Sequence, residues 1–159
     1  YVEFDKLGRT TETGEFTHNS PGRSSSDADD PNFPNAVNCT QCVFEEQSFI
    51  VYDDPANPYF EQSNTRNRVV QVYNKDMASY FDYDVHGNVS SVQQQIREFG
   101  AAEVHYEYEL WSGNVNKVTY QPGTADQFIH RYRYDADNRL TRVMTSNDNN
   151  TWLTEARSL

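Results

Sequence analysis

A short phrase built on tyrosine, an acidic residue and glycine or asparagine recurs in the second half of the chain. The copies begin at Tyr83, Tyr108 and Tyr134, and they read YDVHGNV, YELWSGNV and YDADNRL. The anchoring tyrosines lie 25 and then 26 residues apart. A fixed period of this size is typical of repeat architectures, in which each unit buries its apolar surface only by stacking on its neighbours. The repeat favours a scaffold over a compact enzyme.

Residues between the copies alternate in polarity with a period of two. From Val104 to Leu110, apolar residues alternate with His105, Glu107 and Glu109, and a similar alternation runs from Phe128 to Tyr134. This period is the signature of β-strands. Aromatic residues make up 14% of the chain, which suits strands with one packed and one wet face. The sequence predicts an all-β fold of consecutive antiparallel hairpins that form a curved strip.

The chain divides by composition into five segments. Residues 17–42 are rich in serine, aspartate and proline, a composition that favours an irregular insertion because proline removes ladder donors. The expected division is a degenerate hairpin at 1–16, the insertion at 17–42, degenerate β-repeats at 43–79, three repeats at 80–146, and the start of a further unit or a tail at 147–159.

The N-terminal half departs from the period. Phe4 and Tyr83 lie about three periods apart, so copies are expected near positions 30 and 57, where they are degraded or replaced by the insertion. The segment 92–98 fits either a short helix or a glutamine-rich polar strand.

The recurring phrase resembles the YD repeat of Rhs proteins, which also occurs in the shell component of bacterial Tc toxins and in teneurins. The matching stretches are YVEFDKLGR at 1–9, FDYDVHGNV at 81–89 and YRYDADNRLT at 132–141. The copy at 106–109 has Glu in place of Asp and one residue inserted before Gly113. The repeat residues expected to shape the hairpins are Phe4, Asp5, Gly8, Tyr83, Asp84, Gly87, Tyr108, Gly113, Tyr134, Asp135 and Asn138.

Each repeat residue has an expected physical role. The aspartate accepts backbone N–H bonds across the turn, and glycine or asparagine takes the left-handed conformation. The aromatic residues are expected to stack on equivalent residues of the next repeat.

The resemblance implies a strip of hairpins that spirals into a hollow shell. In many Rhs and Tc proteins such a shell encloses a toxic C-terminal domain, and in teneurins a related shell serves adhesion. The autocatalytic core segment of Rhs proteins is not found in this sequence, so no catalytic residue is transferred to this chain.

The net charge of −11 disfavours partners with anionic surfaces, since nucleic acid and acidic lipid headgroups would be repelled. No apolar run approaches the roughly 20 residues that span a bilayer. The strand-like start at Tyr1 and the absence of a signal peptide there suggest a piece of a longer secreted or bacterial cell-surface protein.

Cys39 and Cys42 form a C-x-x-C pair with three open interpretations: a local disulfide that pins the insertion, free thiols, or metal and redox chemistry. The disulfide is the preferred interpretation for a secreted protein. The acidic run at 27–32 lacks the glycine and distal glutamate of a calcium loop, so a solvated loop is favoured over a calcium site. The four histidines are dispersed, which favours surface roles over catalysis.

The expectation is therefore a structural protein without enzymatic activity or cofactor. It forms part of a shell that encapsulates or presents a toxin or effector domain, and its partners are flanking repeats, that domain or secretion machinery. One alternative is an adhesion or glycan-binding module that exposes Trp111 and Trp152 on one face. Another is a metal- or redox-dependent enzyme centred on Cys39 and Cys42.

Overall fold

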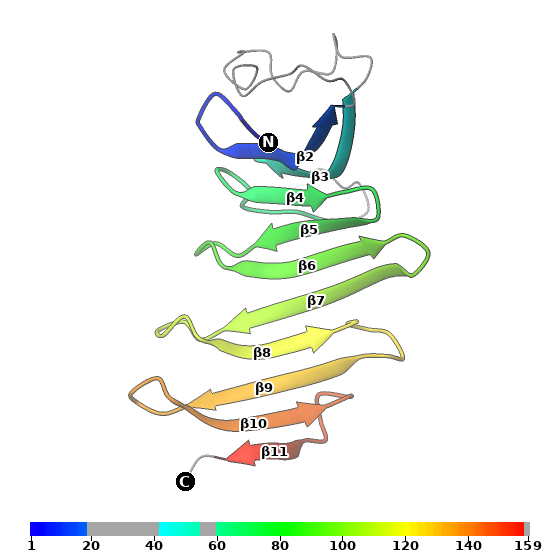
Figure 1. Ribbon diagram of the computed structural model, residues 1–159. Helices are drawn as coiled ribbons and strands as arrows, with labels where there is room; N and C mark the ends of the chain where they lie inside the picture. The colour runs from blue at the N-terminus through cyan, green and yellow to red at the C-terminus, as the bar shows by residue number, and fades with distance from the viewer. Residues whose placement is uncertain (19–41, 55–59, 158–159) are drawn as a thin grey trace.

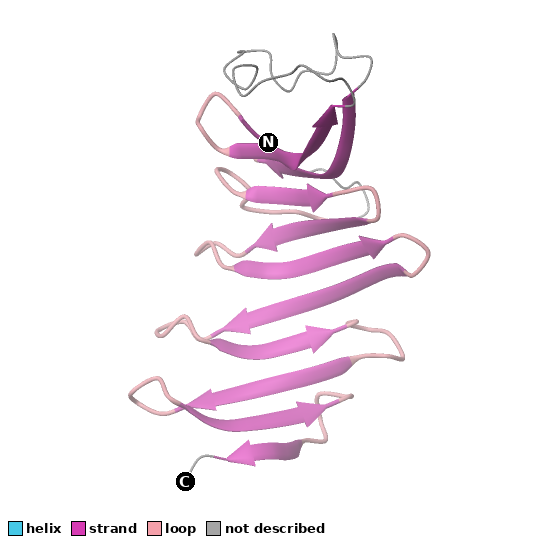
Figure 2. Ribbon diagram, viewed as in Figure 1, coloured by secondary structure: helices cyan, strands magenta, loops and turns pink. Residues whose placement is uncertain are grey.

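A computed structural model describes residues 1–18, 42–54 and 60–157 of the chain, and in these residues it contains strands and turns but no helix. Eleven strands follow one another along the chain (Figures 1 and 2). They are β1 (Val2–Phe4), β2 (Thr10–His18), β3 (Cys42–Tyr52), β4 (Val69–Tyr73), β5 (Met77–Tyr83), β6 (Val89–Ile96), β7 (Gly100–Tyr108), β8 (Val115–Tyr120), β9 (Phe128–Tyr134), β10 (Leu140–Ser146) and β11 (Leu153–Arg157). The described part of the chain offers no helix long and apolar enough to cross a membrane.

The strands form a single antiparallel sheet in sequence order, so each strand pairs only with its neighbours along the chain. The sheet is open and resembles a ladder, with β1 and β11 as its edge strands (Figure 1). This confirms the predicted all-β fold of consecutive antiparallel hairpins. The ambiguous segment 92–98 belongs mostly to β6, which makes it a strand and not a helix.

The two faces of the sheet differ in chemistry, because side chains alternate along each strand and direct cross-strand partners share a face. From β4 to β10 one face, here called the aromatic face, carries no lysine, arginine, aspartate or glutamate in the described registers. It includes Val104, Tyr106 and Tyr108 of β7 and the alternate residues Phe128, His130, Tyr132 and Tyr134 of β9. Half-burial of Val104, Tyr106 and Tyr108 beside exposed His105 and Glu107 confirms the alternation read from the sequence.

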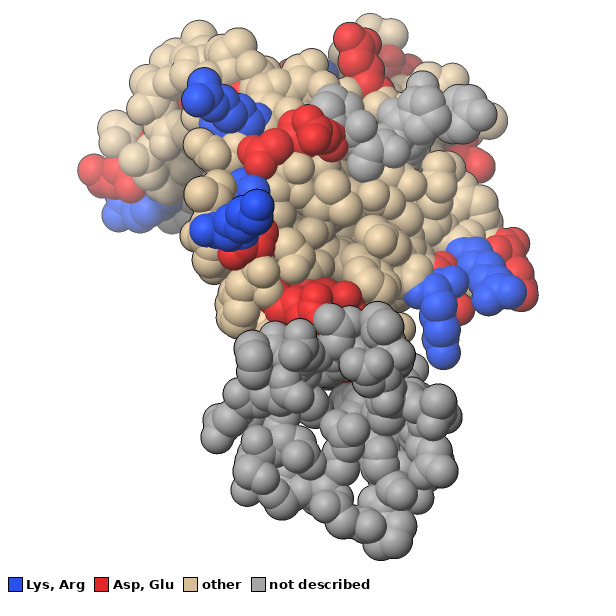
Figure 3. Space-filling view, turned by 90° about the horizontal axis from the view of Figure 1, so that it is seen from above, with Lys and Arg blue, Asp and Glu red and all other residues tan. Residues whose placement is uncertain are grey.

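The opposite surface is here called the charged face. It carries Asp82, Glu103, Glu107, Lys117, Arg131, Arg133 and Arg142, and through the registers of β1 to β4 it also includes Glu3 and Glu12. Figure 3 looks along the strip from above and shows acidic and basic groups side by side at the margins of a largely uncharged surface. The charged face also carries the buried residues Tyr80, Ile129 and Met144, so both faces contribute buried side chains to the strip.

Every hairpin that begins with an odd-numbered strand contains a β-bulge at the same place. The register skips the second residue of the even-numbered strand in all five cases: Thr11, Val70, Ser90, Asn116 and Thr141. A bulge bends its strand and increases the local twist. The same local irregularity therefore recurs in each hairpin, while the sheet as a whole stays open and uncurled and does not show the curvature expected from the sequence.

The segment from Phe60 to Arg68 packs against β4 and β5 rather than projecting into solvent. Its Gln62 side chain is buried, and its Nε2 donates to the carbonyl oxygens of Val70 at 2.7 Å and of Phe81 at 3.0 Å. Val70 is fully buried and Phe60 is 8% exposed. The region 43–79, expected as degenerate repeats, thus contains most of β3, this packed segment, β4 and the start of β5. In this region β3 pairs with β4, and β4 pairs with β5.

Replacing Gln62 with alanine tests this anchor. The substitution leaves the Val70 and Phe81 carbonyls without their amide donor, and we expect a loss of about 1–3 kcal/mol in the free energy of unfolding. Gln127→Ala is the matched control, because Gln127 also donates an amide bond to a backbone carbonyl, that of Asn147, but at an exposed site. Equal, small losses for both variants in urea unfolding would contradict the anchoring role.

Candidate functional site

The candidate site is the row of five hairpin turns along one side of the strip, on the left in Figure 1. In each turn, the backbone N–H of an acidic residue donates to the carbonyl of the residue that leaves the turn. The five bonds are Asp5 to Arg9 at 2.9 Å, Asp53 to Arg68 at 3.1 Å, Asp84 to Asn88 at 2.9 Å, Glu109 to Asn114 at 2.8 Å and Asp135 to Arg139 at 3.0 Å. One turn plan therefore recurs from the first hairpin to the last of these.

The aspartate carboxylates hold the turns closed from within. Oδ1 of Asp84 accepts the backbone N–H groups of His86 at 2.8 Å and Asn88 at 2.9 Å. Asp5 and Asp135 likewise accept the backbone N–H groups of the residues two and four positions further along the chain. This is the Asx-type arrangement expected from the sequence, in which a side chain substitutes for a backbone acceptor.

The residue before the turn exit adopts a left-handed conformation in every copy. Its φ angle is 78° at Gly8, 96° at Gly87, 72° at Gly113 and 60° at Asn138. These are the positions where the sequence requires glycine or asparagine, which tolerate positive φ at low cost. Asn67 has a φ of 59° at the same position of a fifth turn.

The sequence predicts degraded copies near positions 30 and 57, and it shows the similarity of residues 67–69 to residues 138–140 without pairing them with Tyr52 and Asp53. The structure shows a copy that begins at Tyr52 and Asp53 and ends at Asn67 and Arg68, with the segment 54–66 inserted between its halves. The two halves carry the usual Tyr-Asp and Asn-Arg pairs, and the similarity of residues 67–69 to residues 138–140 is the sequence signal that identifies it.

The tyrosine before each turn links its hairpin to the preceding one. Its hydroxyl donates to the carbonyl of the first residue of the preceding even-numbered strand. The four bonds are Tyr52 to Thr10 at 2.9 Å, Tyr83 to Val69 at 2.7 Å, Tyr108 to Val89 at 2.7 Å and Tyr134 to Val115 at 2.9 Å. The acceptor is always the residue just before the bulge. We call this series the tyrosine ladder.

The ladder corrects the expectation that repeat aromatics stack on their equivalents. Among the described residues, no ring contact joins Tyr83, Tyr108 and Tyr134 to one another. Equivalent residues lie two strands apart, about 9.5 Å at the usual strand spacing, while stacked rings need centroids within about 7 Å. A hydroxyl at the end of the ring bridges the shorter distance to the intervening strand.

Arginines connect some of the turns further. Arg9 donates to Asp5 at 2.7 Å and to Asp53 of the next turn at 2.9 Å, and its guanidinium lies 4.3 Å from the centre of the Tyr52 ring. Hydrogen bonds from Arg9 lower the pKa of Asp53, and the backbone N–H of Arg9 is the main cause of the lowered pKa of Asp5. Arg68 lies over Tyr83 at 5.2 Å in the following repeat.

Burial and hydrogen bonding shift other groups of the site. Burial raises the pKa of Tyr83, Tyr108 and Tyr134, which keeps these donors protonated. Burial alone would raise the pKa of Asp84, but bonds from Asn88, His86 and Gly87 outweigh it, and the pKa is lowered.

Two repeat residues depart from this plan. Phe4 has no hydroxyl and is 62% exposed. Glu109 opens a turn that is one residue longer, and its carboxylate accepts the Ser112 hydroxyl at 2.8 Å instead of backbone N–H groups. The ladder and the backbone closure persist without the aspartate, because Tyr108 and the Asn114 carbonyl still make their bonds.

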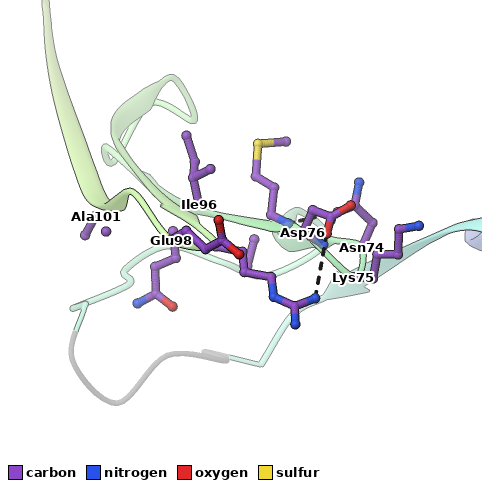
Figure 4. Close-up of a pocket in the computed structure, with 11 residues that line it drawn as sticks. Asn74, Lys75, Asp76, Ile96, Glu98 and Ala101 are labelled. Atoms are coloured by element: carbon purple, nitrogen blue, oxygen red, sulfur yellow. Dashed lines mark hydrogen bonds and ion pairs between the residues drawn. The ribbon is translucent and has the colours of Figure 1, made fainter.

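A metal site would require several ligating side chains close together in the fold. No three His, Cys, Asp or Glu residues in this part of the chain lie close enough to hold a metal ion. The groove in Figure 4 lies between the connection at Asn74 to Asp76 and the β6–β7 connection, and its ion pair joins Arg97 to Asp76 at 3.9 Å. The proposed disulfide of Cys39 and Cys42 falls outside the described residues, since Cys39 and the Cys42 side chain are not described.

No family model matches the chain, and no curated protein matches it at a significant level.

Removing one hydroxyl of the ladder tests its contribution to stability. Tyr108→Phe leaves the Val89 carbonyl without its donor, and we expect it to lower the free energy of unfolding by about 0.5–1.5 kcal/mol. Tyr106→Phe is the control, because Tyr106 lies on the same strand and face and its hydroxyl makes no hydrogen bond among the described residues. Urea unfolding of both variants measures the difference, and a larger loss at Tyr106 would exclude the ladder as a stabilising element.

The turn carboxylates predict a loss of stability in acid. The backbone N–H of Arg139 and its guanidinium lower the pKa of Asp135 below the unfolded value of about 3.9. The ionised carboxylate therefore stabilises the fold above that pH, and the contribution disappears as the pH falls through the folded-state pKa. Asp135→Asn should flatten the decline in unfolding free energy between about pH 5 and about pH 2.

Asp126→Asn serves as the control for acid titration, since the Asp126 carboxylate makes no hydrogen bond or ion pair among the described residues. Its pH profile should match that of the unmodified protein. A profile for Asp135→Asn as steep as that of the control would show that the turn carboxylate does not contribute.

Proposed function

We propose that the chain is a wall segment of a secreted or cell-surface YD-repeat shell that encapsulates or presents a toxin or effector domain. The observation that carries this proposal is the recurrence of one hairpin plan, with the same turn closure, bulge and tyrosine bond in consecutive copies. The plan extends a sheet by one hairpin at a time. The similarity of its phrase to the YD repeat supplies the comparison with a shell.

The arrangement of contacts supports a mechanical role. Each strand pairs only with its sequence neighbours, so the strip is built from local interfaces, as in other repeat proteins. The geometry that recurs between copies lies in turns and strand ends, and its polar groups form hydrogen bonds that hold the backbone. Such a site stabilises a surface and does not concentrate groups for a reaction.

The single layer also fits a wall. Domains usually bury a sheet face against a second layer, and here the aromatic face retains exposed residues such as Phe128 at 39% and Ile96 at 37%. In a shell, the two faces become an inner and an outer surface, covered by flanking repeats, an enclosed domain or secretion machinery.

Electron cryo-microscopy of the native gene product, together with the sequence of its whole reading frame, tests the proposal. We expect a hollow particle whose wall continues this hairpin repeat and whose interior contains another part of the polypeptide. A native product in which both sheet faces meet solvent, with no further repeats, would contradict the shell.

A second candidate function, adhesion through the hairpin tips, is favoured by a separate observation. Apolar residues at the turns are almost fully exposed: Leu7 at 72%, Val85 at 80%, Leu110 at 84% and Trp111 at 87%. They belong to the row of turns on one side of the strip, and exposed apolar surface of this kind marks interaction sites. Trp152, expected to be exposed with Trp111, is instead half-buried in the β10–β11 connection, where it packs under Arg131. Binding to a glycan array that is lost in Trp111→Ala would favour adhesion, and an array without hits would exclude glycan binding.

A further inference from the structure

Basic residues gather on the charged face at the C-terminal end of the strip, although the chain as a whole is strongly acidic. Five of the 13 lysines and arginines lie there on neighbouring strands: Lys117, Arg131, Arg133, Arg142 and Arg157. Arg133 on β9 is the direct cross-strand partner of Arg142 on β10, and Arg142 is the direct partner of Arg157 on β11. We call Arg133, Arg142 and Arg157 the arginine row.

The arginine row is unusual because like charges directly opposite each other destabilise a sheet. None of its three guanidinium groups forms an ion pair with a described residue. The Nε atom of Arg142 is also buried without a hydrogen-bond acceptor in the described part of the chain. Buried donors in native proteins nearly always have a partner, so the row indicates an anionic group that the described part of the chain does not supply.

Nearby carboxylates are already engaged elsewhere. Glu155 on β11 accepts the Thr145 hydroxyl at 2.8 Å, and Asp135 and Asp137 bind Arg139 in the turn. These contacts leave the arginine row without a carboxylate partner among the described residues.

In the preceding hairpin, the positions equivalent to Arg133 and Arg142 show that a carboxylate can pair with a cation at this place in the sheet. There, Glu107 occupies the position of Arg133 and Lys117 that of Arg142, and the two form an ion pair across the hairpin. In the first hairpin, the same positions hold Glu3 and Glu12. The second and third hairpins hold Val51 with Gln71 and Asp82 with Ser91 at these positions, so only the last hairpin places two cations opposite each other.

We infer that the arginine row is a docking site for an acidic segment of a partner polypeptide. Guanidinium groups bind carboxylates through paired hydrogen bonds, and adjacent strands place the row at a spacing of about 5 Å. An aromatic group beside the basic cluster suits a polypeptide, since the Trp152 ring lies 4.2 Å from the Arg131 guanidinium. The net charge of −11 repels a long polyanion, which would extend beyond the row over the acidic remainder of the chain. A short segment with a few carboxylates interacts mainly with the arginine row.

A second copy of this chain is a less suitable occupant. Its acidic pair would be Glu3 and Glu12, but the Glu12 carboxylate already accepts bonds from the Tyr1 hydroxyl and from the Gln47 amide. The inference concerns this surface alone and stands apart from the shell proposal.

Fluorescence anisotropy with a labelled peptide of alternating glutamate and leucine tests the inference on the whole chain. We expect binding that weakens at least about tenfold when Arg133, Arg142 and Arg157 are all changed to glutamate, because each charge-assisted bond becomes a repulsion. Raising the ionic strength from about 0.01 M to about 0.1 M should weaken it as well, since the Debye length falls from about 30 Å to about 10 Å.

The matched control reverses three exposed cations away from the row: Lys6→Glu, Lys75→Glu and Arg97→Glu. It changes the net charge by the same amount, and the peptide affinity should stay within about twofold of the unmodified protein. Equal losses in both triple variants, or no peptide binding at low salt, would overturn the inference.

Two further measurements keep the test decisive. If the charge-reversed protein fails to fold, Arg142→Gln with Arg157→Gln replaces it; relief of like-charge repulsion should leave its thermal midpoint equal or higher, while peptide affinity falls. A charge-matched oligodeoxynucleotide and a heparin-derived oligosaccharide are measured in parallel, and tighter binding of either would overturn a polypeptide partner. So would a concentration-dependent dimer that Arg142→Gln abolishes.

Discussion

The hydrogen bond from a turn tyrosine to the carbonyl of the preceding hairpin is the contact on which the strip depends. Each such carbonyl belongs to the residue before a bulge, so the bond fixes the point where the register shifts. Turn closure by the aspartate sets where the tyrosine lies, and the bulge sets where its acceptor lies. Because the sheet has only one layer, these repeated local contacts replace the large core of a compact domain.

The same plan explains how the strip accommodates inserted residues. The segment inserted between Asp53 and Asn67 lengthens a turn but leaves its backbone closure in place, since the Asp53 N–H still donates to the Arg68 carbonyl at 3.1 Å. The carboxylate of Asp53 accepts the N–H of Asn67 at 2.6 Å, one residue before the exit residue that donates in the other aspartate turns. Lengthening a loop costs little entropy once its ends are fixed. The insertion then adds its own anchor through Gln62, which supplies buried hydrogen bonds to β4 and β5.

Much of this fold can be predicted from the sequence, because two signals agree. Alternation in β7 and β9 indicates strands and their faces, and the glycine or asparagine positions indicate the left-handed turns. The copy at Tyr52 is harder to detect, because the residues 54–66 separate its Tyr-Asp pair from its Asn-Arg pair. The insertion also removes the regular spacing to the next copy. The ladder was also not predicted: the sequence shows recurring tyrosines but not that equivalent rings lie two strands apart. The arginine row depends on register, which places Arg133, Arg142 and Arg157 together only after each bulge is known.

Native-state hydrogen exchange of the acidic residues' turn amides tests the central claim most directly. If five hairpins share one plan, the amide of Asp53 should be protected as strongly as those of Asp84 and Asp135, because each donates to the residue that leaves its turn. Rapid exchange at Asp53, at the rate of an open loop, beside protected amides at Asp84 and Asp135, would contradict a repeat that continues through the insertion.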